Sequence, residues 1–225
     1  MNKIFFVFCL MGVLLLPIQS LGEPGKCIEG DCINGKGTYA WPDGKKCTGD
    51  WKDGTRTGQG KCIWPDGASY TGGYMQNMKM GKGIFTWPDG TKYEGGFVND
   101  KQNGMGTMES PDGKKYVGDW KDGMKNGQGR STWPDGSEYT GAWEDDFPSG
   151  QGTFTSHNGN YTGEFKFGNP DGKGEFTWPD GRKHIGEFKQ GTVHGYGVEI
   201  SPDGKRKEGY WENDTYLGKE KPKEK

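Results

Sequence analysis

One short motif recurs along almost the whole chain at a nearly fixed interval. The motif is Trp-Pro-Asp-Gly or a close copy, and successive copies start 23 residues apart, with a single step of 22. A fixed period of about 20–50 residues indicates a repeat protein, in which one small unit is stacked many times. The third residue of the motif falls at Asp43, Asp66, Asp89, Asp112, Asp135, Asn158, Asp180 and Asp203.

The composition argues against an ordinary aliphatic core. Only 29% of the 225 residues are hydrophobic, whereas 43 are glycine. Such compositions are common in disordered chains, but the 9 Trp, 10 Tyr and 11 Phe recur at fixed repeat positions, which indicates order. The 29 basic and 31 acidic residues are interleaved, so the chain has no basic surface for nucleic acid.

Each unit reads as a β-hairpin. In the first half, aromatic residues alternate with glycine at a period of two, as in Tyr93-Glu-Gly-Gly-Phe97, which is typical of a strand. The second half carries Gly-x-Gly and a second strand. Pro-Asp-Gly then forms a three-residue turn, because proline presets φ and glycine adopts the left-handed conformation.

Centring the turns on the aspartates fixes a strand register. It predicts three rows on one face, since residues spaced by two share a face. One row consists of glycine only, and another alternates a large ring with glycine, so that Phe97 lies opposite Gly104. The first row is Tyr39, Cys47, Cys62, Tyr70, Phe85, Tyr93, Met108, Tyr116, Ser131, Tyr139, Phe154, Tyr161, Phe176 and His184.

We therefore expect an all-β fold: an elongated, single-layer antiparallel sheet of stacked β-hairpins, with about seven to eight repeats. The glycine row allows the strands to bend and the rings to lean over the backbone. The resulting aromatic trough is the candidate binding surface, although the same rings are also needed to hold the sheet together. Its residues are Tyr70, Tyr74, Tyr93, Phe97, Tyr116, Trp120, Tyr139, Trp143, Tyr161 and Phe165.

The pattern Tyr-x-Gly-x-Trp/Phe, followed by Gly-x-Gly and Asp-Gly at 23-residue spacing, resembles the MORN (membrane occupation and recognition nexus) repeat. The resemblance covers roughly Cys27 to Gly218, and Cys47, His184 and Lys207 depart from it at tyrosine positions. It implies a β-hairpin array used for protein interaction, scaffolding or membrane apposition. Family members include arrays attached to lipid kinases and junctional membrane proteins, for which lipid binding has been proposed.

The N-terminus has the pattern of a secretory signal peptide. Lys3 precedes an apolar run of 13 residues, Ile4 to Leu16, and small residues at Ser20 and Gly22 suit a cleavage site. The predicted organisation is a signal peptide at 1–22, a repeat array at 23–218 and a charged, disordered tail at 219–225. We expect the mature chain to be exported: periplasmic, envelope-associated or secreted.

Four cysteines follow the signal peptide, and an even count in an exported chain favours disulfides. The register places Cys47 opposite Cys62, so we predict a Cys47–Cys62 disulfide and, by elimination, a Cys27–Cys32 disulfide. A zinc site formed by the same cysteines is the alternative, but zinc sites favour spacings of about two to four residues within each pair. A lipid anchor on Cys27 is a further alternative that the preceding residues do not favour.

No catalytic arrangement is evident. None of His157, His184 and His194 has an identifiable partner for general-base catalysis. Turn chemistry explains the periodic aspartates, and the EF-hand pattern of a calcium loop is missing. We expect no enzyme activity, no metal and no cofactor. Asn160 and Asn213 begin glycosylation sequons that matter only in a host that modifies secreted chains.

The favoured function is a non-enzymatic exported module that binds a protein partner or self-associates through the aromatic trough. Association with an envelope or lipid surface is the alternative. The slightly acidic charge and the lack of a basic amphipathic helix give that alternative little support. A carbohydrate-active enzyme is a third possibility, but no carboxylate pair stands out from the repeat pattern.

Overall fold

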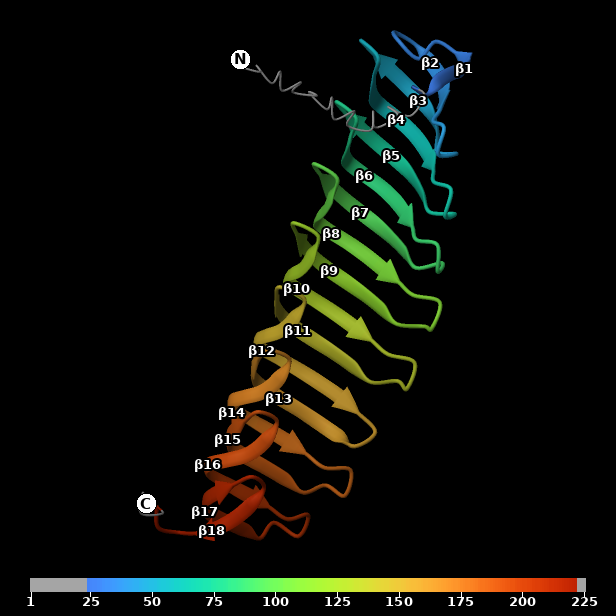
Figure 1. The fold of residues 1–225 in the computed structure, drawn as a ribbon. Coiled ribbons are helices and arrows are strands. Elements are labelled where there is room, and N and C mark those ends of the chain that lie inside the picture. Colours follow the sequence, from blue (N-terminus) through green and yellow to red (C-terminus); the bar gives the residue numbers. More distant parts are fainter. Residues whose placement is uncertain (1–23, 222–225) are drawn as a thin grey trace, which may run out of the picture.

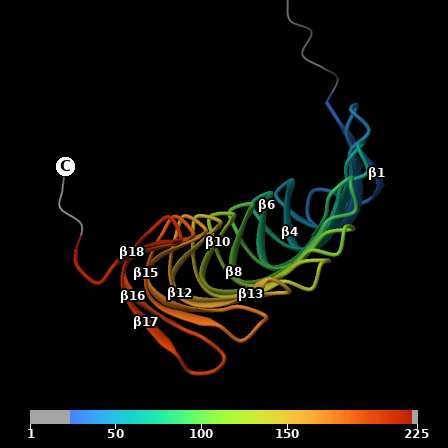
Figure 2. The same ribbon diagram turned by 90° about the horizontal axis from the view of Figure 1, so that it is seen from below.

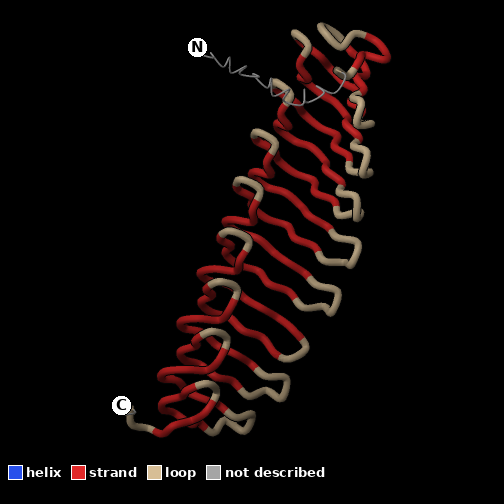
Figure 3. The backbone as a smooth tube through the Cα atoms, viewed as in Figure 1, coloured by secondary structure: helices blue, strands red, loops and turns tan. Residues whose placement is uncertain are grey.

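The computed structural model describes residues 24–221, and the predicted signal peptide lies outside this range. Within it there is no helix, and 18 strands form one open antiparallel sheet (Figures 1 and 3). The strands are β1 (Lys26–Gly30), β2 (Lys36–Ala40), β3 (Lys46–Lys52), β4 (Thr55–Ile63), β5 (Ser69–Met75), β6 (Met78–Thr86), β7 (Lys92–Val98), β8 (Lys101–Glu109), β9 (Lys115–Lys121), β10 (Met124–Thr132), β11 (Glu138–Glu144), β12 (Phe147–Ser156), β13 (Gly159–Lys166), β14 (Asn169–Thr177), β15 (Lys183–Lys189), β16 (Thr192–Ile200), β17 (Arg206–Glu212) and β18 (Thr215–Gly218).

The sheet is a long ribbon in which each strand pairs with its neighbours in sequence (Figure 1). The Pro-Asp-Gly turns line one edge and the tight hairpin ends line the other (Figure 3). The turns form as predicted: Gly90, with φ of 87°, donates its amide hydrogen to the Trp87 carbonyl at 3.0 Å. The Asp89 carboxylate accepts the amide hydrogen of Thr91 at 2.8 Å.

The predicted first row and glycine row are confirmed. Tyr93 pairs with Phe85 on one side and Met108 on the other, while Gly95 pairs with Gly83 and Gly106. The first row continues from Tyr39 to His184 without a break. The recurring Pro-Asp-Gly turns keep this register, and the shorter turn between Ser156 and Gly159 preserves it as well.

The predicted pairing of Phe97 with Gly104 within one repeat is wrong. Phe97 pairs with Gln102 instead, because a bulge follows the Gly95–Gly106 pair and adds two residues to the second strand. Gly104 takes a left-handed φ of 73°, which turns the chain at this point. Across the other edge of β8 the expected pattern holds, and Gly104 pairs with Trp120.

The bulge bends the second strand of each hairpin over the rings. Lys79 and Phe85 are six residues apart in β6, a separation of roughly 20 Å in a straight strand. Yet the Nζ atom of Lys79 lies 4.5 Å from the centre of the Phe85 ring. The face that carries the rings is therefore concave, and the ribbon is curved when seen from its end (Figure 2). We call this concave side the ring face and the opposite side the reverse face.

Both predicted disulfides are present. Cys47 and Cys62 lie opposite each other in the β3–β4 hairpin with their Cα atoms 4.1 Å apart, and Cys27 is joined to Cys32. Close Cα atoms are typical of the narrow, non-hydrogen-bonded pairs of an antiparallel sheet. Cross-links thus take the place of rings at the N-terminal end of the array.

Candidate binding surface

The ten rings predicted as a binding trough form the core. Each tyrosine makes edge-to-face contacts with the large ring of its own repeat and with that of the next repeat, with centroids 4.9–5.3 Å apart. Such pairs contribute roughly 0.5–1.5 kcal/mol each beyond area burial. We call this chain of rings the ring ladder. All ten predicted residues belong to the ring ladder and are only 0–6% exposed, so their first role is to hold the repeats together.

Hydrogen bonds fix the tyrosines within the ring ladder. Each first-row tyrosine from Tyr70 to Tyr161 donates its hydroxyl to the carbonyl three residues later in its own strand, as Tyr93 does to Gly96 at 3.0 Å, whereas the Tyr74 hydroxyl has no partner. Burial raises the pKa of Tyr93 to about 12, so the phenol stays protonated. The ring lies directly over the glycine row, because an added Cβ at Gly106 would come within 2.6 Å of Tyr93 Cζ.

A second set of rings lies on the ring face but remains half-buried. These are the tryptophans that open the Pro-Asp-Gly turns, which we call the turn tryptophans: Trp41, Trp64, Trp87, Trp133 and Trp178. Trp87 packs 4.6 Å from Phe85, and Phe85 also contacts Trp64 at 5.8 Å. Together with Phe85, Phe154 and Phe176, the turn tryptophans present aromatic surface that lies outside the ring ladder.

The turn forms equally well without its tryptophan. Ser110 and Ser201 occupy the same position in two repeats, and their carbonyls accept the same turn hydrogen bond at 2.9 and 2.8 Å. By contrast, the large-ring position of the ring ladder is aromatic in every repeat from Trp51 to Trp211. A ring that the fold does not require, and that stays half-exposed, is available to a partner.

The bulge creates a further row of side chains, which we call the cover row. Each member pairs with the large ring of its own repeat, and the row changes from basic and polar in the first four members to apolar in the last four. It consists of Arg56, Lys79, Gln102, Lys125, Pro148, Pro170, Val193 and Tyr216.

Cations of the cover row lie over aromatic rings. Arg56 lies 4.6 Å from the ring centre of Tyr74, and Lys125 lies 4.9 Å from that of Tyr116. Burial lowers the pKa of both Lys79 and Lys125, and nearby Asp100 and Asp146 oppose this effect. Those two carboxylates bind the backbone amides of Lys79 and Lys125, each at 2.9 Å.

No carboxylate neutralises these cations directly within the described part of the chain. Arg56, Lys79 and Lys125 have no carboxylate oxygen within 4.0 Å, and neither has Lys45, which lies over Trp41 at 4.7 Å. The ion pairs that do form lie in exposed positions, as between Lys92 and Glu94. The ring face therefore offers half-buried positive charges that no carboxylate pairs directly, although Arg56 donates hydrogen bonds to Asn77.

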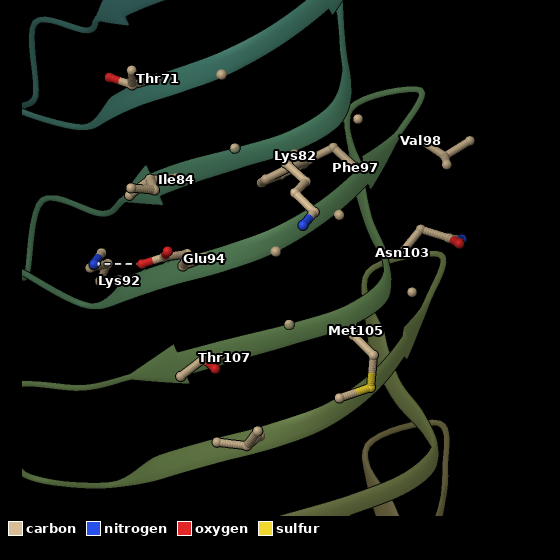
Figure 4. A pocket seen from close by; sticks show the side chains of 18 of the residues that line it. Thr71, Lys82, Ile84, Lys92, Glu94, Phe97, Val98, Asn103, Met105 and Thr107 are labelled. Atoms are coloured by element: carbon tan, nitrogen blue, oxygen red, sulfur yellow. Dashed lines mark hydrogen bonds and ion pairs between the residues drawn. The ribbon is translucent and has the colours of Figure 1, made fainter.

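The reverse face carries a groove of about 1120 Å³ over β5 to β9 (Figure 4). Its floor is glycine backbone, and its walls include Ile84, Thr107 and the exposed Met105. Lys82 and the Lys92–Glu94 ion pair add charges of both signs. Among the described residues, Phe97 is the one aromatic residue that lines this groove, whereas the ring face carries many rings and several cations.

The C-terminal end of the ring ladder contains His184 in place of tyrosine. The imidazole is 0% exposed and lies edge-on between Phe188 and Trp211, at 5.5 and 5.2 Å. Neither ring nitrogen has a hydrogen-bond partner. Burial lowers its pKa from 6.5 to about 4, with Asp214 opposing the shift.

Residues 24–221 contain neither a metal-binding cluster nor a membrane-spanning helix. No group of three or more His, Cys, Asp or Glu side chains could hold a metal ion there. No helix in that range is long and apolar enough to cross a membrane.

Sequence reasoning missed the turn tryptophans and the cover row. The signal for the turn tryptophans was available, because serine replaces tryptophan at Ser110 and Ser201 without loss of the turn motif. The bulge prevented prediction of the cover row, because strict alternation pairs each large ring with a glycine instead of with the cover-row residue.

Comparison with known proteins supports the repeat assignment. The MORN repeat family model matches residues 33–46, 47–69, 70–92, 93–115, 116–138, 139–160, 161–181 and 184–206. Among solved structures, a mutant TCP10 domain of Danio rerio CPAP is 17% identical, with a TM-score of 0.42, over 79% of this chain and 90% of that one. The Drosophila melanogaster SAS-4 TCP domain, solved with a proline-rich motif of Ana2, is 14% identical, with a TM-score of 0.39, over 88% and 97% of the two chains. No curated protein matches the sequence.

Proposed function

Because the chain belongs to the MORN repeat family, we propose that it is a non-enzymatic binding or scaffolding module that holds a protein partner on its ring face. One observation carries the proposal: the turn tryptophans stay half-exposed although the turn forms equally well with serine. Tryptophan is enriched at the energetic centres of protein interfaces. The ten ladder rings contribute indirectly, by fixing the curvature of the surface on which the turn tryptophans lie.

The proposed module works outside the reducing cytosol. Its two disulfides support this, because such cross-links persist in oxidising compartments. The N-terminal sequence supports export by the secretory route. The periplasm, the cell envelope and the extracellular medium all satisfy this requirement.

The test is affinity capture of the tagged, exported protein from the envelope and secreted fractions of its own cell. The double variant Trp87→Ser/Trp133→Ser carries the substitution that two natural repeats already contain. We expect it to keep the urea midpoint of the unmodified protein to within a few tenths molar while losing most of the captured partner.

The matched control alters the reverse face. Met105→Thr and Val117→Thr reduce apolar surface there without touching the ring ladder, so capture is expected to persist. The Trp120→Ala variant is a second control, expected to lose about 3–5 kcal/mol of stability because its ring is buried in the core. Full capture by the double tryptophan variant, with loss in the reverse-face variants, would refute the proposal.

A further inference from the structure

The first row and the cover row carry only positive charges over the first repeats, although Asp100 and Asp146 lie near Lys79 and Lys125. Neither the first row nor the cover row contains an acidic residue before Glu199, whereas the cover row alone contributes Arg56, Lys79 and Lys125. Lys45 adds a fourth cation between Trp41 and Trp64, at 4.7 and 5.3 Å from their rings. The asymmetry is local, because the whole chain has a formal net charge of −2.

These cations are partly desolvated and have no directly paired carboxylate. Burial lowers the pKa of Lys45, Lys79 and Lys125, although nearby aspartates oppose this effect. An incoming carboxylate would supply the missing partner at a site where water screens it poorly. Rings beside each cation would shield such an ion pair from solvent.

The repeat sets the spacing of the cations. Neighbouring repeats lie two strands apart, or about 10 Å along the ribbon. Arg56 and Lys79 are one repeat apart, and Lys125 follows two repeats later with Gln102 between them. A chain in the polyproline II conformation rises about 3.1 Å per residue with three residues per turn, so every third side chain lies on the same face and one turn of about 9.3 Å spans one repeat.

We propose that the ring face between Arg56 and Lys125 binds an acidic polypeptide segment in the polyproline II conformation, with a carboxylate at every third residue. The proposal rests on the proposed function and specifies its partner. Gln102 would accept or donate a neutral hydrogen bond at the third position of the series.

The geometry favours a polypeptide over an anionic membrane. The cations lie on the concave side, beneath bent hairpin ends, where a narrow chain fits. A flat bilayer would instead meet the rims, and there charges of both signs are already paired, as in Lys114–Asp112 and Arg182–Asp180.

The test is fluorescence anisotropy with the purified protein and a labelled twelve-residue peptide. Glutamate occupies positions 1, 4, 7 and 10 of this probe, and serine and threonine fill the rest. A second peptide has the same composition with its four glutamates contiguous, and a third has glutamine in their place. We expect the spaced peptide to bind at least fivefold more tightly than either control.

Lysine-to-glutamine variants on the two faces distinguish the effect of a cation's position from the effect of the protein's net charge. Lys79→Gln and Lys125→Gln should each weaken binding of the spaced peptide about fivefold, whereas the equal charge change at Lys61→Gln or Lys82→Gln on the reverse face should alter it less than twofold. Gln102→Lys fills the gap in the series and should tighten binding about fivefold. That gain cannot result from misfolding.

Three outcomes would overturn the proposal. They are equal binding of all three peptides, equal weakening by the reverse-face variants, and binding to phosphatidylserine vesicles without binding to the spaced peptide. Each is distinguishable from failure of the proposed function. If capture still depends on Trp87 and Trp133, the ring face binds a protein whose chemistry is not acidic.

Discussion

Replacing His184 by tyrosine should stabilise the C-terminal repeats and remove a pH dependence. The imidazole occupies a ladder position where five other repeats have a tyrosine whose hydroxyl donates to a carbonyl three residues later. In the variant, that acceptor would be the carbonyl of Glu187. The glycine pair Gly186–Gly197 already provides the space that a ladder tyrosine covers.

The magnitude follows from the pKa of the imidazole. Folding lowers this pKa from 6.5 to about 4, so the folded state binds fewer protons than the unfolded state below pH 6.5. The stability that neutral His184 contributes is therefore fully present above pH 6.5 and is lost as the pH falls towards 4. Linkage gives a loss of about 2 kcal/mol between pH 7.5 and pH 5, and at most about 3 kcal/mol below pH 4.

The charged groups around His184 act in opposite directions. Glu199 pairs directly with it across β15 and β16, and Asp214 raises its pKa. Lys207 lies beyond Glu199 in the same row, with its Nζ atom 5.2 Å from the Trp211 ring. Desolvation by the surrounding rings outweighs the effect of Asp214, which is why the pKa falls.

The assay compares hydrogen exchange in β15 to β17 for the unmodified protein and His184→Tyr, each at pH 7.5 and pH 5. Tyrosine adds one hydrogen bond, so we expect a gain of about 1 kcal/mol at pH 7.5. At pH 5 the gain should rise to about 3 kcal/mol. Comparing the proteins at the same pH cancels intrinsic exchange rates and the titration of surface carboxylates. An unchanged difference between the two pH values, or an NMR titration that places the His184 pKa near 6.5, would refute this reasoning.

Three further predictions concern the repeat itself. Gly106→Ala should cost about 1–3 kcal/mol in urea unfolding, because the new methyl group would collide with the Tyr93 ring, and a neutral result would contradict the ladder packing. The paired change Cys47→Ala/Cys62→Ala should cost about 3 kcal/mol, the value for a closed loop of 15 residues, and dithiothreitol should have little additional effect on that hairpin. Asp146→Ala should cost about 1–2 kcal/mol, since it removes the acceptor for the Lys125 amide and places alanine at a φ of 72°, whereas Asp146→Asn should be nearly neutral.

The sequence predicted the parts of the fold that depend on periodicity. Alternation with a period of two places Tyr93, Gly95 and Phe97 on one face, and the Pro-Asp-Gly turns fix which residues meet across the strands. This register also selected the Cys47–Cys62 pairing among the four cysteines, once their even number and the expected export favoured disulfides. These features are local, so a single chain contains the information for them.

The bulge could not be predicted in the same way, because the two glycines of Gly-x-Gly look alike in the sequence but serve different purposes. Gly104 has open space around it and is needed for its left-handed φ of 73°. Gly106 lies under the Tyr93 ring and is needed because it has no side chain. The equivalent bends at Gly81 and Gly127, with φ of 74° and 80°, bring Lys79 and Lys125 over the rings, and the candidate surface depends on these bends.

The covalent cross-links lie at one end of the ribbon only, since both join residues before β5. In a linear array each repeat is supported mainly by its neighbours, so tension should open the array from the end without cross-links. Each released repeat of 23 residues would add roughly 75 Å of extended chain. Under tension the molecule would thus lengthen in even steps from its C-terminal side, and unfolding would stop at Cys62, where the disulfide holds the chain. It would act as a tether with one fixed end and one extensible end.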